Sequence, residues 1–218
     1  MRLAILIVVV LSTATNAVGQ DSQGEPRLLE FEGPFGRPTV SFAADCTLEL
    51  NGAKSTCRLI QVPNRVRWEI LGRATVILYT DLWVSYSMVP NRKMYIEVDQ
   101  RNSPARSDGP NAARWTVKRL DSDTDQGLVR TRYHAESTHA NGDTFTATMW
   151  LAEAYNLVVE SRGTSFIRGK TIVSHFKLSN IQIGPQDPAL FYPPPDYQRM
   201  GTGLDPMPGG KPQGAVSP

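Results

Sequence analysis

CTLELNGAKSTC, residues 46–57, has the sequence of a tight β-hairpin. Asn51 and Gly52 stand in its middle, and Asn-Gly is the strongest short hairpin signal because both residues of the turn need positive φ. With these two residues as the loop, the numbers of facing positions sum to a constant, so Cys46 faces Cys57. Facing Cα atoms in an antiparallel pair lie about 4.5–5.5 Å apart, which is within disulfide reach. We therefore predict an antiparallel hairpin closed by one disulfide.

The same register places other favourable neighbours opposite each other. Glu49 faces Lys54 and Thr47 faces Thr56. Opposite charges and paired threonines both stabilise facing strands. The pairing is thus supported along the hairpin and not only at its cysteines.

The N-terminus indicates the compartment in which this disulfide forms. Arg2 precedes the apolar run Leu3–Leu11, and Ser12–Gly19 is small and polar. The apolar run is much shorter than the roughly 20 residues that span a bilayer, so we predict a signal peptide over residues 1–19, cleaved after Ala17 or Gly19. The mature chain would be periplasmic, with no transmembrane segment. In an exported protein two cysteines favour a structural disulfide over a redox or metal pair.

Alternation with a period of two recurs on the C-terminal side of the hairpin, in RVRWEIL (65–71), KMYIEV (93–98), TFTATMWL (144–151) and TIVSHFKL (171–178). One face of each stretch is apolar and the other is polar, which is typical of antiparallel strands; buried parallel strands would be apolar throughout. The positions that we assign to the inward, apolar face are Val66, Trp68, Ile70, Met94, Ile96, Phe145, Met149 and Phe176.

Turn signals separate these stretches at short intervals, which predicts an up-and-down meander that forms a barrel or a curved open sheet. We place turns at Leu71–Gly72, Thr80–Asp81, Val89–Asn91 and Arg162–Gly163. At Asn141–Gly142 a two-residue loop would pair Met149 with His134. A loop one residue longer would pair Met149 with Tyr133, and we prefer that register.

Composition divides the rest of the chain. We predict one domain over residues 20–200, with a polar, aperiodic loop at Asp99–Ala113 between two halves of the sheet. Residues 201–218 are rich in Pro and Gly and are predicted to be disordered. The net charge of +2 is too small and too scattered to favour nucleic acid as a partner.

The motifs that would indicate an enzyme or a metal site are incomplete in this sequence. DSDTDQG (121–127) begins like a calcium loop but lacks the required Gly and carboxylate, so we predict a turn. GTSFIRGKT (163–171) has five residues between its glycines where a phosphate loop needs four, so we predict a hairpin. We predict surface histidines at His134, His139 and His175, and outward-facing carboxylates at Glu69, Glu97 and Glu160. No catalytic residue, metal ligand or cofactor is predicted.

The chain ends with SNIQIGPQDPALFYPPPDYQRM, residues 179–200. Asp187 before Pro188 is a helix-start signal, but Pro193–Pro195 leave room for about one turn. We therefore predict that Asp187 caps a one-turn helix.

Several stretches occur together in a familiar order: FAADCTLELNG (42–52), RVRWEILGRATVILYTDLWVSYSMVPNRKMYIEV (65–98), NGDTFTATMWL (141–151) and the C-terminal stretch. Over about residues 40–200 the chain resembles an exported bacterial family similar to LolA/LolB-type lipoprotein carriers and outer-membrane lipoprotein-sorting proteins. The resemblance implies an antiparallel sheet curled into an incomplete barrel around an apolar concavity, with short helical segments covering its open side. It also implies that Leu190 and Phe191 enter one mouth of the barrel as a lid.

The expected fold is therefore mainly β (α+β), a LolA-like half-barrel. The function that we expect is non-enzymatic binding of a lipid, an acyl chain or a lipoprotein by the inward apolar residues. Two alternatives stay open from the sequence. One is an envelope protein–protein interaction or stress-sensing module with a filled core, and the other is an enzyme whose site has no recognisable motif.

Overall fold

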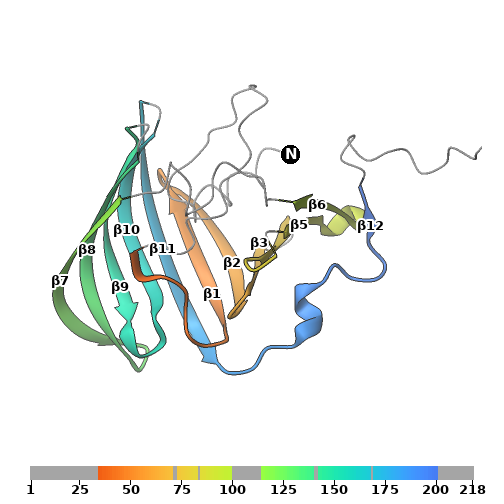
Figure 1. Cartoon of the computed structure of the whole chain (residues 1–218), viewed down its shortest axis with the longest axis horizontal. Coiled ribbons are helices and arrows are strands. Elements are labelled where there is room, and N and C mark those ends of the chain that lie inside the picture. Colours follow the sequence, from red (N-terminus) through yellow and green to blue (C-terminus); the bar gives the residue numbers. More distant parts are fainter. Residues whose placement is uncertain are drawn as a thin grey trace, which may run out of the picture.

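The predicted hairpin lies at the centre of the sheet in the computed structural model, which describes residues 34–70, 73–82, 84–99, 114–139, 142–167 and 169–200 (Figure 1). Strands β1 (Phe42–Leu50) and β2 (Ala53–Val62) are joined by Asn51 and Gly52, whose φ angles of 48° and 84° are the positive values that the turn requires. Cys46 faces Cys57 and forms a disulfide with it, with 4.9 Å between the two Cα atoms. The predicted register and disulfide are confirmed.

Two meanders extend from this hairpin. The first continues through β3 (Arg65–Ile70), β4 (Ala74–Tyr79), β5 (Val84–Val89) and β6 (Met94–Asp99). The second consists of β7 (Arg114–Asp125), β8 (Leu128–Thr138), β9 (Thr144–Ala152), β10 (Leu157–Ile167) and β11 (Lys170–Ile183). Within each meander every strand pairs with the next one in the chain, and β11 then pairs with β1. The result is one sheet of 12 strands in the order β12-β6-β5-β4-β3-β2-β1-β11-β10-β9-β8-β7.

The sheet is curved and does not close. β7 is one edge, and the short β12 (Gln198–Arg199), parallel to β6, is the other. In Figure 1 the strands β7–β11 stand side by side, and β3–β6 bend away from them. The protein is thus mainly β, but its order is not a simple meander, because β6 and β7 follow each other in the chain and lie toward opposite edges.

Three short 3₁₀ turns interrupt the strands: η2 (Pro90–Arg92), η3 (Glu153–Tyr155) and η4 (Pro188–Phe191). The Asp187 carboxylate accepts a hydrogen bond of 2.9 Å from the Ala189 amide at the start of η4. This confirms the predicted one-turn helix and its cap. None of the helices in the described ranges is long and apolar enough to cross a membrane.

The turn predicted at Arg162–Gly163 is wrong, because both residues lie inside β10. Gly163 is needed there for packing: a Cβ atom at this position would lie 2.8 Å from the Ala147 Cβ atom and 2.9 Å from the Phe145 ring. The turn of this hairpin comes later, and Ile167 faces Lys170 across it. The predicted hairpin is confirmed with its turn moved toward the C-terminus.

The longer loop predicted near Gly142 is confirmed by the pairing of β8 with β9, in which Met149 faces Tyr133. The predicted signal peptide, the loop at 99–113 beyond Asp99, and the tail at 201–218 lie outside the described residues.

Candidate functional site

All eight residues predicted to face inward lie on one face of the sheet. The facing pairs Trp68–Val76, Val76–Ser87 and Ser87–Ile96 connect β3 to β6. On the other side, Met149 faces Ser161, which faces Phe176. Facing residues of an antiparallel pair point to the same side, so these strands direct their apolar residues to a common face.

This face is concave. The rings of Trp68 and Phe176 have centroids 6.2 Å apart, although β2 and β1 lie between their strands. Neighbouring strands are spaced about 4.8 Å apart, so a flat sheet would hold the two side chains roughly 14 Å apart. The sheet therefore curls so that side chains from its two halves meet.

The eight residues differ in exposure. Five are buried, with exposed fractions between 1% and 8%: Val66, Trp68, Ile70, Phe145 and Met149. The other three, Met94, Ile96 and Phe176, keep part of their surface exposed. Trp68 belongs to the large core cluster around the disulfide, whereas Phe145 and Met149 pack in a smaller cluster with Phe35 and Trp115.

Trp68 carries a polar atom that stands out on this apolar face. Its indole Nε1 is buried, and the described residues provide no hydrogen-bond acceptor for it. Buried donors are nearly always paired, because an unpaired one loses its hydration without compensation. An acceptor oxygen at this position would satisfy the indole.

Leu190 and Phe191 lie on the opposite face of the sheet from the eight residues. Phe191 is 1% exposed and packs with Ile60, Ile77 and Met88, whose side chains alternate with those of the concave face. A lid formed by Leu190 and Phe191 would therefore cover this second face.

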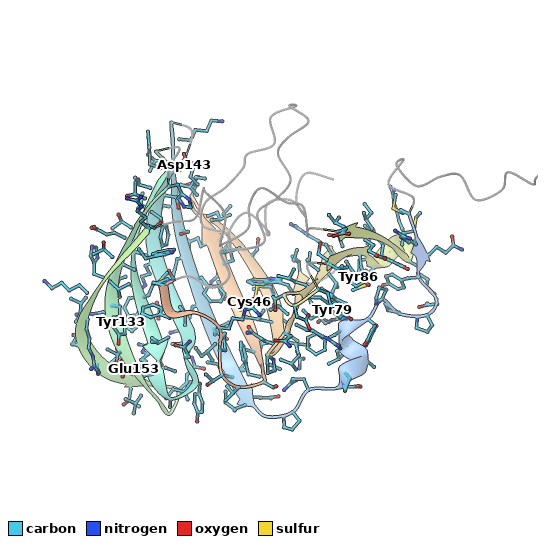
Figure 2. All side chains as sticks on the ribbon, in the orientation of Figure 1. Cys46, Tyr79, Tyr86, Tyr133, Asp143 and Glu153 are labelled. Carbon is cyan, nitrogen blue, oxygen red and sulfur yellow. A yellow bond between two sulfur atoms is a disulfide. The ribbon has the colours of Figure 1, made fainter. Side chains whose placement is uncertain are left out.

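Hydrogen bonds fix η4 in that position. The Arg67 guanidinium donates to the Leu190 carbonyl at 2.6 Å, and the Tyr79 hydroxyl donates to the Phe191 carbonyl. Burial raises the pKa of Tyr79 to about 12, although the nearby Arg65 acts in the opposite direction. Figure 2 shows Tyr79 and Tyr86 close together beside η4, and their rings meet edge to face at 5.7 Å. The C-terminal segment is thus part of the aromatic core of the second face.

Beyond β1, the second face carries a charged cluster around Glu160, which corrects the prediction of an exposed carboxylate. Its side chain is only 2% exposed. The Arg162 guanidinium lies 2.6 Å from its Oε1 atom, His175 Nε2 lies 3.0 Å from the same atom, and Arg130 lies 3.2 Å from Oε2. Lys177 Nζ is 3.8 Å away. Glu160 points to the predicted side, but cations from β8, β10 and β11 cover it.

These contacts keep Glu160 ionised. Burial disfavours the charged form, but hydrogen bonds from Arg162 and His175 outweigh it and lower the pKa of the carboxyl group. Arg130 is held from its other side by Asp123 at 2.5 Å and by Asp125 at 2.9 Å. The cluster therefore ties the end of the β7–β8 hairpin to the middle of the sheet.

A shallow hollow of about 540 Å³ lies beside this cluster. His134, Thr148, Arg162 and His175 follow one another across β8, β9, β10 and β11 and contribute to its floor. The hollow offers imidazoles, hydroxyls and a guanidinium that is held by Glu160.

Of the three histidines predicted on the surface, His134 and His175 have side chains 41% and 35% exposed. His139 is the exception, because it is only 4% exposed in the β8–β9 connection. No group of three or more metal-binding side chains occurs within the described ranges.

No protein-family model matches the sequence, and no match was found among curated proteins. The search of solved structures gives similar folds at low identity. PNGF-II is 8% identical with a TM-score of 0.41, over 76% of this chain and 32% of that one. MucB, also solved from Pseudomonas aeruginosa in complex with MucA, is 16% identical with a TM-score of 0.45, over 70% of this chain and 57% of that one.

A LolA superfamily protein from Nitrosomonas europaea is also among the similar structures. It is 10% identical with a TM-score of 0.36, over 72% of this chain and 91% of that one. The expected resemblance to LolA-type proteins is thus found among the solved structures, while the chain spans only a third of PNGF-II and just over half of MucB. At these identities, ligand and partner have to be argued from the side chains.

Proposed function

We propose that this protein is a non-enzymatic binding protein of the periplasm, and that it holds a lipid, an acyl chain or the acyl part of a lipoprotein on its concave face. The observation that carries the proposal is the common face of the eight apolar residues from β3, β6, β9 and β11. Burial of an apolar ligand against them would contribute about 25 cal/mol per Å² of apolar surface.

The partly exposed residues give the ligand its entrance. Met94 and Ile96 lie on β6, near one edge of the sheet, where an acyl chain can reach the concave face. Trp68 supplies the polar contact, since its buried Nε1 would donate to a carbonyl or carboxyl oxygen. The preferred ligand is therefore an acyl compound with an oxygen acceptor.

Native mass spectrometry with lipid extraction, on protein purified from its own host, tests the proposal. We expect a stoichiometric adduct that extracts as lipid, and uptake of the fluorescent fatty acid parinaric acid by the delipidated protein. Ile96→Lys should abolish uptake by charging the entrance. Val173→Lys is the matched control, because Val173 is 55% exposed on the other face. A bare mass together with no uptake by the unmodified protein would overturn the proposal.

The proposed hydrogen bond from Trp68 to the ligand can be tested separately by NMR. In a spectrum of indole N–H groups, the Trp68 signal should move downfield when a fatty acid binds, and Trp68→Phe identifies that signal. Binding without a shift would remove Trp68 from the site while leaving the apolar site in place.

A second candidate function is binding of a partner protein, and the observation that favours it is the exposed edge strand β7. Its residues from Thr116 to Thr124 are all exposed.

A further inference from the structure

The first half of β7 is an open, basic edge of the sheet. Within the described ranges, β7 pairs with β8 alone. Arg114 and Lys118 share one face of the strand with Thr116 between them, while Trp115 and Val117 point to the other face. From Arg114 to Lys118 the edge strand thus carries cations on one side and apolar groups on the other, and Arg119, which follows on the second side, is paired with Glu153.

The two cations have no counterion in the described part of the chain, since neither Arg114 nor Lys118 takes part in an ion pair there. Glu136, which faces Thr116 on β8, bonds His134 at 3.0 Å. Arg119, at the end of this half, lies 3.2 Å from Glu153. Among the described residues, nothing neutralises the positive charge of Arg114 and Lys118.

The second half of β7 differs in charge and in shape. Its aspartates are bound by cations of the same protein: Asp121 by Arg132 at 2.6 Å, Asp123 by Arg130 at 2.5 Å, and Asp125 by Lys177 at 3.2 Å. The pairing with β8 is also irregular between Arg119 and Ser122. Regular edge backbone with unpaired charge is thus confined to residues 114–119.

We propose that residues 114–119 of β7 bind an extended segment of another protein in which acidic and apolar residues alternate. The segment would add a strand to the sheet through main-chain hydrogen bonds. Its acidic side chains would lie beside Arg114 and Lys118, and its apolar ones beside Trp115 and Val117. This inference specifies the second candidate function and rests on it; the apolar site is independent of it.

Charge also decides against a second copy of this chain. An antiparallel pair of β7 strands centred on Thr116 would set Arg114 of one copy against Lys118 of the other, and like charges directly opposite are unfavourable. Two copies of β7 could also pair with the basic half of one strand facing the acidic half of the other. That pairing would be centred on the irregular stretch between Arg119 and Ser122. The aspartates of the acidic half are also already bound by cations of their own chain. Irregular, charged edges are a common guard against self-pairing, and here the same charges select an acidic strand.

The test uses the whole protein and two blocked peptides of equal length, one of alternating glutamate and valine and one of alternating lysine and valine. We expect the glutamate peptide to bind about tenfold or more tightly, because two facing charge pairs change sign between the peptides. The amide signals that shift should belong to residues 114–119. The double variant Arg114→Glu, Lys118→Glu should reverse the preference, and a glutamate peptide methylated on alternate backbone nitrogens should not bind.

Each other outcome overturns the proposal in a distinguishable way. Equal binding of both peptides at β7 would overturn the acidic specificity but leave the edge as a partner site. No binding of either peptide would overturn both. Concentration-dependent dimers that the double variant abolishes would assign the edge to a second copy.

Discussion

Glu160 shows how far a single residue can be predicted from its neighbours in sequence. Alternation along β10 assigns its side chain to the polar face, and the structure places it there. Its burial depends on Arg130 and Lys177, which lie 30 and 17 positions away and approach only after the sheet has formed. The local pattern therefore predicts the face of the sheet to which the Glu160 side chain points. Its exposure depends on charged residues that are distant in the sequence.

Replacement of Glu160 by Gln should be destabilising. The change leaves Arg130 and Arg162 beside a neutral group, but Asp123 and Asp125 still hold Arg130 and the Arg162 side chain is 60% exposed. We therefore expect a loss of about 1–3 kcal/mol. Urea unfolding at neutral pH measures the loss. Glu136→Gln, on an exposed carboxylate, is the matched control and should change the free energy of unfolding by less than about 0.5 kcal/mol.

The difference between the unmodified protein and the Glu160→Gln variant should also depend on pH. Because the folded-state pKa of Glu160 is lowered, its ionic contribution is fully present above the ordinary glutamate pKa and is lost as the pH falls through the lower folded value. The free energies of unfolding of the two proteins should therefore converge as the pH falls below the ordinary glutamate pKa. Curves that keep a constant separation would show that Glu160 does not titrate in this range.

Gly163 is the second residue whose role sequence alone misassigns, since glycine inside a strand and glycine in a turn look alike. We expect Gly163→Ala to destabilise the protein by about 1–3 kcal/mol, because the added methyl group would overlap Ala147 and the Thr146 carbonyl. Thr164→Ala, at the next and exposed position, should have little effect. Thermal unfolding of the two variants compares them directly.

At the scale of elements, prediction succeeds where the signal is local. The β1–β2 hairpin follows from Asn-Gly and alternating residues within a stretch of twelve, and the cap of η4 follows from Asp187 and Pro188. The docking of η4 is not local: Phe191 binds a face built from β2, β4 and β5. Nothing within residues 179–200 specifies which face of the sheet it covers.

The disulfide should stabilise this central hairpin measurably. Replacement of Cys46 and Cys57 by Ala should lower the free energy of unfolding by about 2.5–3 kcal/mol in the chain-entropy account. The reduced protein should lose a similar amount, so urea unfolding with and without reductant provides an independent check. A loss confined to the variant would point to packing of the sulfur atoms in place of the crosslink.

Phe191→Ala should destabilise the protein and should also expose the Tyr79 hydroxyl to water. Loss of a buried phenylalanine costs about 3–5 kcal/mol, and better hydration of Tyr79 should bring its pKa down from about 12 toward the ordinary value of 10. Absorbance of tyrosinate during alkaline titration reports the change, and Tyr79→Phe identifies the signal. An unchanged titration curve would mean that η4 does not shield this phenol.

At the scale of the whole molecule, the pairing of β1 with β11 is the feature that sequence did not predict. Alternation and turn signals specify each meander, but they carry no information on which strands meet at the join. The predicted apolar face spans both halves, and the Trp68–Phe176 contact across the join completes it. The local patterns therefore predict the composition of the candidate site, while β1–β11 pairing assembles it.

This join should hold the two meanders together without a covalent link between them. We expect a chain cut once between residues 100 and 113 to remain a single particle in size-exclusion chromatography and to separate into two pieces only in denaturant. The reason is that β1 and β11 face each other over eight residue pairs, and the apolar core crosses the join. Separation of the pieces under native conditions would contradict this expectation.

The same join has a consequence for how the protein is made. β1 comes first among the described strands and β11 near the end, so residues 51–169 must emerge, from the ribosome or into the periplasm, before β1 meets its second neighbour. Where translation sets the pace, at about 5–20 residues per second, this interval lasts roughly 6–24 s. During that time one side of β1 is bare and could capture a strand from another nascent chain. The topology should therefore lower the yield of correctly folded protein during its synthesis, while the stability of the folded protein is unaffected.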